Sequence, residues 1–211
     1  MKTPMSIALL SCALLASPGM AAPQQPANPD CAVDRAQLMV LDKVHFDEDT
    51  TGGGWRTLAA RPGCETAAAD LLRDYRKAHP KDTGLMIWHE AQLRAFAGQT
   101  AQAAALMEQT RMPAAADRMG WNPYVDATIA FLRKDRRALE QAHARLAAVP
   151  PPVGKNIPPV VNGSMTVDMS DGTTRQIRFP QNIDVVEGLE QCFDKPYAEA
   201  YTSDACRPRA D

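Results

Sequence analysis

Aromatic residues make up only 6% of this 211-residue chain, so smaller side chains have to fill most of its core. An excess of one charge is lacking as well. The 23 Lys and Arg stand against 25 Asp and Glu, which excludes the basic surface of a nucleic-acid-binding protein and an acidic disordered tail. The sequence has no Cys-x-x-Cys pair, no His-Glu-x-x-His zinc motif, no Gly-x-Ser-x-Gly turn and no glycine-rich phosphate loop. These absences predict a protein without a metal, a cofactor or a catalytic residue.

Long apolar runs are absent after the first segment of the chain. Met5 to Ser17 form an apolar stretch of 13 residues behind Lys2, and Ala21 and Ala22 follow a Pro-Gly break. A membrane-spanning helix needs about 20 apolar residues, so this layout is typical of a cleaved secretory signal peptide. We therefore expect a signal peptide over residues 1–21, cleavage near Ala21 or Ala22, and a periplasmic or secreted location.

A lipid anchor is the alternative interpretation of the same segment. Leu9, Leu10 and Ser11 precede Cys12 as in a lipoprotein site, but apolar residues continue past Cys12 instead of ending there. Cleavage without an anchor is therefore favoured. A Pro- and Gln-rich flexible leader over 22–29 then begins the mature chain.

Four cysteines remain after cleavage, and an even number in an exported chain predicts two disulfide bonds. Cys192 and Cys206 end successive short predicted helices, so a turn between these helices would bring them together. Cys31 then pairs with Cys64 across a polar, glycine-rich segment over 45–54. The alternatives, in which Cys31 pairs with Cys192 or Cys206, require the two ends of the chain to meet.

Alanine separates the chain into two regions, because none of the 35 alanines lies between Ala148 and Ala198. Over 30–150, apolar residues recur at helical spacing. Helix starts and stops are marked by Asp30, Pro80, Gly98, Thr100, Asn122 with Pro123, Asp135 and Pro150. The predicted helices cover 30–44, 66–78, 85–97 and 135–149, and two more begin at residues 100 and 122.

The helical region repeats with a period of 35 residues. This shift superimposes alanines in three units: Ala60, Ala95 and Ala130, and again Ala68, Ala103 and Ala138. Small residues let paired helices pack closely, and a glycine or polar turn reverses the chain between them. Over about residues 50–150 the pattern resembles the tetratricopeptide repeat family in a degenerate form, since some units lack the closing proline or the turn glycine. The resemblance implies paired helices with a concave, peptide-binding face.

The resemblance also implies candidate binding residues. First helices line the concave face in this family, and Trp88 with Gln92, then Tyr124 with Thr128, lie one turn apart on the first helices of two successive units. The alternative is that Trp88 and Tyr124 belong to the core between repeats, which the scarcity of large apolar residues favours.

Beyond residue 150 the composition changes. A Pro-rich linker over 151–163 leads to a β-hairpin over 164–179, because Met165, Val167 and Ile177 alternate with polar residues. Two short helices, opened by Asn182 and Pro196, complete a disulfide-closed C-terminal segment over 180–211. The predicted fold class is mainly α, a paired-helix repeat array with a small β-hairpin insertion.

Two other patterns lack the residues that their chemistry needs. The segment from Asp47 to Gly52 resembles the start of a calcium loop, but Leu58 stands where the acidic ligand at the twelfth position is required. His89 and Glu90 begin a zinc motif whose second histidine is replaced by Leu93. We expect a solvated loop and a surface histidine here, with no metal.

These features predict an exported protein that binds a protein or peptide of the cell envelope without catalysis and without nucleic acid. One alternative is a periplasmic inhibitor or immunity protein. Another is a hydrolase-like enzyme whose site the motifs do not capture, in which case Asp47 or His89 would be needed for turnover.

Overall fold

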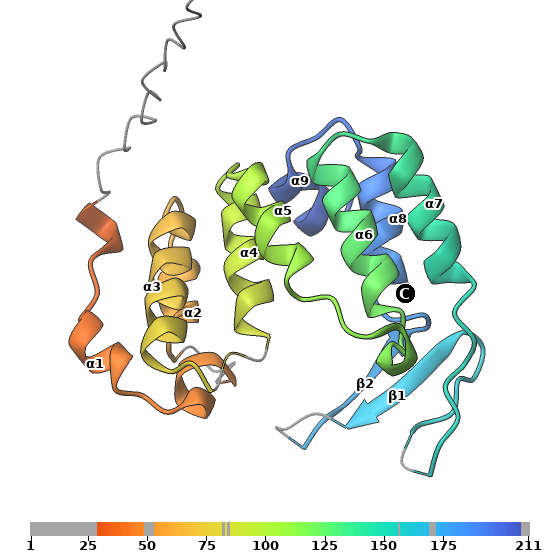
Figure 1. Cartoon of the computed structure of the whole chain (residues 1–211), viewed down its shortest axis with the longest axis horizontal. Coiled ribbons are helices and arrows are strands. Elements are labelled where there is room, and N and C mark those ends of the chain that lie inside the picture. Colours follow the sequence, from red (N-terminus) through yellow and green to blue (C-terminus); the bar gives the residue numbers. More distant parts are fainter. Residues whose placement is uncertain are drawn as a thin grey trace, which may run out of the picture.

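The computed structural model of the chain describes residues 29–48, 53–81, 83, 85–155, 157–168 and 172–207. This part is mainly helical, with a two-stranded antiparallel sheet (Figure 1). The predicted signal peptide, its cleavage site, the alternative lipid site at Cys12 and the leader up to residue 28 lie outside the described residues. Within the described ranges, no helix is both long and apolar enough to cross a membrane.

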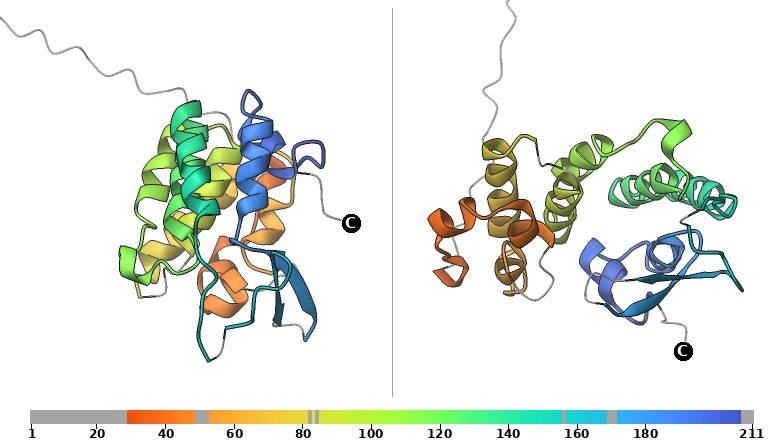
Figure 2. Two further views of the ribbon diagram at one scale, coloured as in Figure 1. Left: turned by 90° about the vertical axis from the view of Figure 1, so that its right-hand side faces the viewer. Right: turned by 90° about the horizontal axis from the view of Figure 1, so that it is seen from below.

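Five helices form the body of the molecule, and each packs against the one before it (Figures 1 and 2). They are α3 (Glu65–Ala78), α4 (Met86–Phe96), α5 (Thr100–Glu108), α6 (Trp121–Leu132) and α7 (Arg136–Ala147). The helices α4 and α6 begin 35 residues apart, and the repeat alanines Ala68 and Ala103 are fully buried. The mainly helical prediction is confirmed, whereas membership of the tetratricopeptide family stays a resemblance.

The predicted N-terminal cap is confirmed for one helix and wrong for another. Asp135 caps α7, because its carboxylate accepts a hydrogen bond from the backbone N–H of Ala138 at 3.0 Å. The N-terminus of α6 differs from the prediction that Asn122 caps it. Asp117 accepts from the N–H groups of Trp121 and Asn122, at 2.7 and 2.8 Å. The Asn122 side chain instead bonds the backbone N–H and C=O of Met112.

Two other predicted caps also lack a side-chain bond. Thr100 is the first residue of α5 rather than its cap, and Gln99 takes the cap position without a capping hydrogen bond from its side chain. Asn182 precedes the eighth helix with a left-handed φ of 65° and makes no capping bond.

The C-terminal region follows the predicted order. A hairpin of β1 (Ser164–Asp168) and β2 (Thr174–Arg178) pairs Met165 with Ile177, and it is followed by α8 (Ile183–Gln191) and α9 (Tyr197–Thr202). The helix α8 packs on α6 and α7, and α9 packs on α4 and α8. The last two helices thus close the chain back onto the middle of the molecule.

The N-terminal region is where the prediction of one helix over 30–44 is wrong. The structure has a 3-10 turn over Pro29–Cys31, a short α1 (Arg35–Met39) capped by Asp34, and a π-helical turn over Val44–Glu48. A side chain of α3 binds the backbone between these short elements: the Tyr75 hydroxyl donates to the carbonyl of Leu41 at 2.7 Å. Val40, which lies within the predicted helix over 30–44, is 81% exposed.

The glycine-rich segment over 45–54 is likewise not a solvated loop where it is described. Phe46 and Asp47 are buried, and the Phe46 ring stacks on Tyr75 with centroids 3.6 Å apart. The short helix α2 (Arg56–Ala59) then leads into α3. Residues 49–52, which the calcium-loop pattern also needs, lie outside the described part of the chain.

Two disulfide bonds tie down the two ends of the described chain. Cys31 is joined to Cys64 and Cys192 to Cys206, with Cα–Cα distances of 5.4 and 5.6 Å. This is the predicted sequential pairing. Disulfides persist in oxidising compartments, so the two bonds agree with a periplasmic or extracellular protein.

A groove between the hairpin and the C-terminal helices

Three of the four residues predicted to bind a peptide lie inside the molecule. Trp88 and Tyr124 are 4% and 2% exposed, and Thr128 is fully buried. The ring centroids of Trp88 and Tyr124 are 5.1 Å apart, and Trp121 packs against both. The hydroxyl of Thr128 donates to the carbonyl of Tyr124 at 3.0 Å. This burial supports the alternative interpretation, in which these side chains form the core between helix pairs.

Gln92, the fourth predicted residue, is half-buried on α4 at the interface with α9. Three phenols gather at this interface. Burial, together with the neighbouring Tyr197 and Tyr201, raises the pKa of Tyr124 well above its usual value. Burial also raises the pKa of Tyr197, so both phenols stay neutral. The neutral hydroxyl groups of Tyr124 and Tyr197 can act as hydrogen-bond donors.

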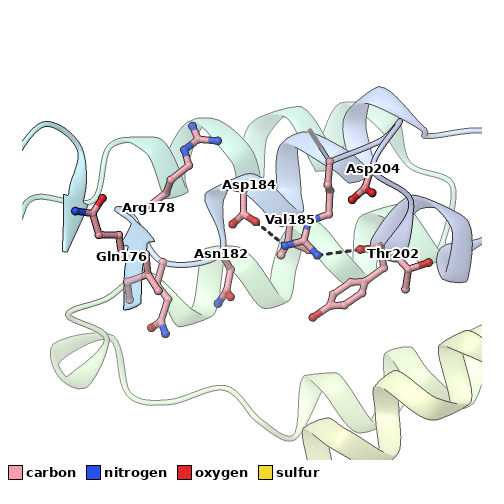
Figure 3. Close-up of a pocket in the computed structure, with 11 residues that line it drawn as sticks. Gln176, Arg178, Asn182, Asp184, Val185, Thr202 and Asp204 are labelled. Atoms are coloured by element: carbon pink, nitrogen blue, oxygen red, sulfur yellow. Dashed lines mark hydrogen bonds and ion pairs between the residues drawn. The ribbon is translucent and has the colours of Figure 1, made fainter. Parts of the chain in front are cut away.

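A groove of about 550 Å³ lies between β2, α8 and α9 (Figure 3). Three side-chain amides, four charged groups and the ring of Tyr201 contribute to its walls. The residues that line it are Gln176, Ile177, Arg178, Gln181, Asn182, Asp184, Val185, Tyr201, Thr202, Asp204 and Arg207. None of them was singled out from the sequence as a site residue.

Charged groups of the groove are already paired within the fold. Arg207 binds the carboxylate of Asp184 at 2.5 Å and the carbonyl of Tyr201 at 2.8 Å (Figure 3). Arg178 binds both carboxylate oxygens of Glu187, at 2.5 and 2.9 Å, and this hydrogen bonding raises its pKa. A ligand therefore meets a surface of amides and of charged side chains in which Arg178 and Arg207 each already have a carboxylate partner.

Local packing holds Arg207 in this position. Its side chain lies directly over Gly188 of α8, where a Cβ atom would overlap the arginine stem. The Cys192–Cys206 disulfide joins the end of α8 to the residue before Arg207. The glycine and the disulfide together fix one wall of the groove.

The groove follows the outer edge of β2. Consecutive residues of a strand project to opposite faces, yet Gln176, Ile177 and Arg178 all line the groove. The groove thus contacts residues of both faces of β2 at its C-terminal end, and β1 occupies one of the strand's two edges. The other edge of β2 lies beside the groove.

A second polar cluster lies at the other end of the molecule. Asp47, 4% exposed, accepts hydrogen bonds from Trp55 Nε1 at 2.9 Å and from His89 Nδ1 at 2.8 Å. Burial raises the pKa of Asp47, but these hydrogen bonds and the charges of His89 and Arg56 outweigh it, so the pKa lies below the usual value. The structure thus brings together the two residues that an enzymatic interpretation would need.

The surroundings of this pair favour a structural role. Both partners of Asp47 are side chains that anchor the π-helical turn to α4 and to the residue before α2. Neither the groove nor the smaller hollow beside Pro158, Val161 and Thr166 reaches the pair. Within the described residues, no group of three or more His, Cys, Asp or Glu side chains could hold a metal ion.

Comparison of the chain with protein-family models, curated proteins and solved structures finds no match.

Proposed function

We propose that this chain is a non-catalytic binding protein of the periplasm or extracellular space, and that it holds a peptide segment of a cell-envelope protein in the groove. The observation that carries the proposal is the convergence of three side-chain amides, Gln176, Gln181 and Asn182, on one open cavity. An amide side chain offers two donors and one carbonyl acceptor, which matches the groups of a peptide backbone.

The composition of the groove favours a peptide over a small apolar ligand. Small-molecule pockets are mostly lined by hydrophobic side chains with a few polar groups. Here Ile177, Val185 and the Tyr201 ring are the main apolar contributions, and the other lining side chains are polar or charged. A hydrated, polar segment of another protein fits such a surface better.

The compartment is proposed on two independent grounds. The first is the predicted signal peptide, with cleavage near Ala21 or Ala22. The second is the pair of disulfides, which would not persist in a reducing cytoplasm. Both point to a partner that also resides outside the cytoplasm.

A display experiment tests the proposal. Peptides selected from a random library against the disulfide-bonded chain are titrated by calorimetry into the wild type and two variants. Thr202→Trp places a large side chain in the groove at an exposed position, and Thr100→Trp makes the same change at an exposed position away from it. We expect 1:1 binding to the wild type and to Thr100→Trp, and at least tenfold weaker binding to Thr202→Trp.

Failure to select any peptide that binds saturably would contradict the proposal, and so would equal binding by Thr202→Trp and the wild type. Selection of a folded enzyme as a tight stoichiometric partner would instead support the inhibitor alternative.

A further inference from the structure

We propose that the peptide binds by adding a third strand to the open edge of β2. This inference rests on the proposed function and specifies how the groove is used. It also specifies the peptide: an extended segment with uncharged polar side chains on one face and at least one carboxylate on the other.

The direction of each backbone group in β2 follows from the hairpin register. Phe179 donates its N–H to the carbonyl of Gly163, which continues the observed pairing of Ser164 with Arg178 by one residue. In an antiparallel pair, hydrogen-bonded and non-hydrogen-bonded positions alternate. Ile177 and Arg175 therefore exchange backbone hydrogen bonds with their partners on β1, Met165 and Val167. The backbone groups of Thr174, Gln176 and Arg178 point away from β1.

The same alternation is visible on the other strand. Ser164, opposite Arg178, exchanges backbone hydrogen bonds with Val161 at 2.8 and 3.0 Å, on the side of β1 away from β2. The edge of β1 is thus partly covered by the chain itself. In the described residues no backbone hydrogen bond joins the outer edge of β2 to another element.

An uncovered edge beside a groove is the arrangement used in β-strand addition, in which main-chain hydrogen bonds supply affinity and alternate side chains enter pockets. Three residues of β2 have backbone groups that point away from β1, and two of them, Gln176 and Arg178, line the groove. An added strand would place alternate side chains beside the amides of Gln181 and Asn182. These side chains should be uncharged, because Arg178, Asp184 and Arg207 already have charged partners.

The opposite face of the added strand lies on the side of Arg175 and Ile177, and Ile177 also lines the groove. Arg175 is exposed and makes no ion pair with any described residue, and it shares its face of β2 with Ile177. A carboxylate on the neighbouring strand would pair with it, since opposite charges on adjacent strands stabilise a sheet.

A second copy of the chain is a poor occupant of the same edge. β2 carries both Arg175 and Arg178, so two copies meeting edge to edge would gather four arginines. Charged residues on an edge strand oppose such pairing. The charge pattern therefore favours an acidic segment of another protein over self-association.

The test uses two capped five-residue peptides of opposite charge, Ac-TETET-NH2 and Ac-TKTKT-NH2, titrated into the full disulfide-bonded chain. Each matches the five residues of β2 in length and alternates threonine with a charged residue. We expect Ac-TETET-NH2 to bind at least threefold more tightly than Ac-TKTKT-NH2.

Two variants at position 176 separate backbone from side-chain recognition. Gln176→Pro removes an outward N–H without breaking a hairpin bond, as proline is tolerated on edge strands at such positions. Gln176→Ala keeps the N–H and removes only the amide side chain. We expect at least a fivefold loss of Ac-TETET-NH2 affinity for the proline variant and a smaller loss for the alanine variant, with thermal melts showing that both are folded.

A charge reversal gives a second test that leaves the backbone intact. Arg175→Glu should reverse the preference, so that Ac-TKTKT-NH2 binds more tightly than Ac-TETET-NH2. Strand addition is overturned if neither peptide binds, if Gln176→Pro binds as the wild type does, or if the preference is unchanged in Arg175→Glu. The proposed function would survive that result if display-selected peptides still required the groove, and it would fail only if they did not.

Discussion

The two disulfide-closed ends of the described chain are stabilised in different ways. At the Cys31–Cys64 end, side chains bind backbone carbonyls far along the chain: Arg61 donates to Asp30 and Ala32, and Tyr75 donates to Leu41. At the Cys192–Cys206 end, regular helices pack their apolar faces into the main core through Leu189 and Ala200. At the first end, side chains from distant parts of the chain bind several backbone carbonyls, whereas the second end leaves a strand edge open beside a groove.

This difference teaches how each end relates to function. The N-terminal segment over 29–48 uses its polar groups for internal closure, including the buried Asp47. The C-terminal segment gets its stability from helix packing and a short covalent loop, so the polar groups of β2 and of the loop before α8 stay available to a ligand. Four predictions test this contrast.

The disulfides should give the largest effects. In the chain-entropy model, a bond across the sequence separation of 33 between Cys31 and Cys64 stabilises the fold by about 3.7 kcal/mol, and one across the separation of 14 between Cys192 and Cys206 by about 3.0 kcal/mol. Urea unfolding of the two Cys→Ser pairs measures both. We expect the loss of Cys31–Cys64 to be the more costly and to expose 29–48 to proteolysis; the reverse order would contradict the contrast.

Overpacking should separate packed helices from the N-terminal segment. Ala103→Leu inserts bulk at a fully buried helix contact and should cost about 1–3 kcal/mol. Ala36→Leu makes the same change in α1, where the residue is exposed, and should shift stability by less than about 0.5 kcal/mol. If the two substitutions destabilised the fold equally in thermal melts, Ala36 would have to lie at a packed contact, which would contradict the contrast.

Removal of single hydroxyl groups should affect the two ends unequally. Tyr75→Phe deletes the bond to the carbonyl of Leu41 and leaves that acceptor without its partner, at a cost of about 1 kcal/mol. Thr202→Val deletes a local bond to Ala198 within α9, at an exposed position, and should cost less than about 0.5 kcal/mol. Faster amide exchange over 29–48 in the tyrosine variant alone would confirm the contrast.

Acid should weaken the N-terminal end through Asp47. Its pKa is lower in the folded chain than in the unfolded chain, so it stabilises the fold above the unfolded pKa, and this contribution is lost as the pH falls through the folded value. Urea unfolding between pH 6 and pH 3 should show a steeper loss of stability for the wild type than for Asp47→Asn. Identical pH profiles for the two proteins would show that Asp47 does not stabilise the N-terminal end.

Sequence patterns predicted the elements that apolar periodicity dictates. The helices from α3 to α9, the hairpin and the disulfide pairing were predicted close to their observed bounds, because each rests on local spacing or on adjacent elements. The predictions failed over 30–54, where one helix over 30–44 and a solvated loop after it were expected. There the chain follows bonds from Tyr75 and His79, more than thirty residues away, which no local pattern indicates.

The candidate site was missed for a related reason. The aromatic residues Trp88 and Tyr124 were selected for their spacing, but scarce aromatic side chains are needed in the core, and both are buried there. The groove combines β2, the loop before α8 and the C-terminus of α9, which only the tertiary fold brings together. One local signal of an edge strand was present: Ile177 is the one apolar residue over Thr174–Arg178, and the other four are polar or charged.

Amide hydrogen exchange measured by NMR, with and without saturating Ac-TETET-NH2, tests the central claim most directly. The account predicts that the peptide slows exchange at Thr174, Gln176 and Arg178, whose N–H groups point outward. Arg175 and Ile177, already bonded to β1, should not change, and neither should the residues over 29–48. Protection elsewhere without these three amides, or equal protection along all of β2, would contradict it.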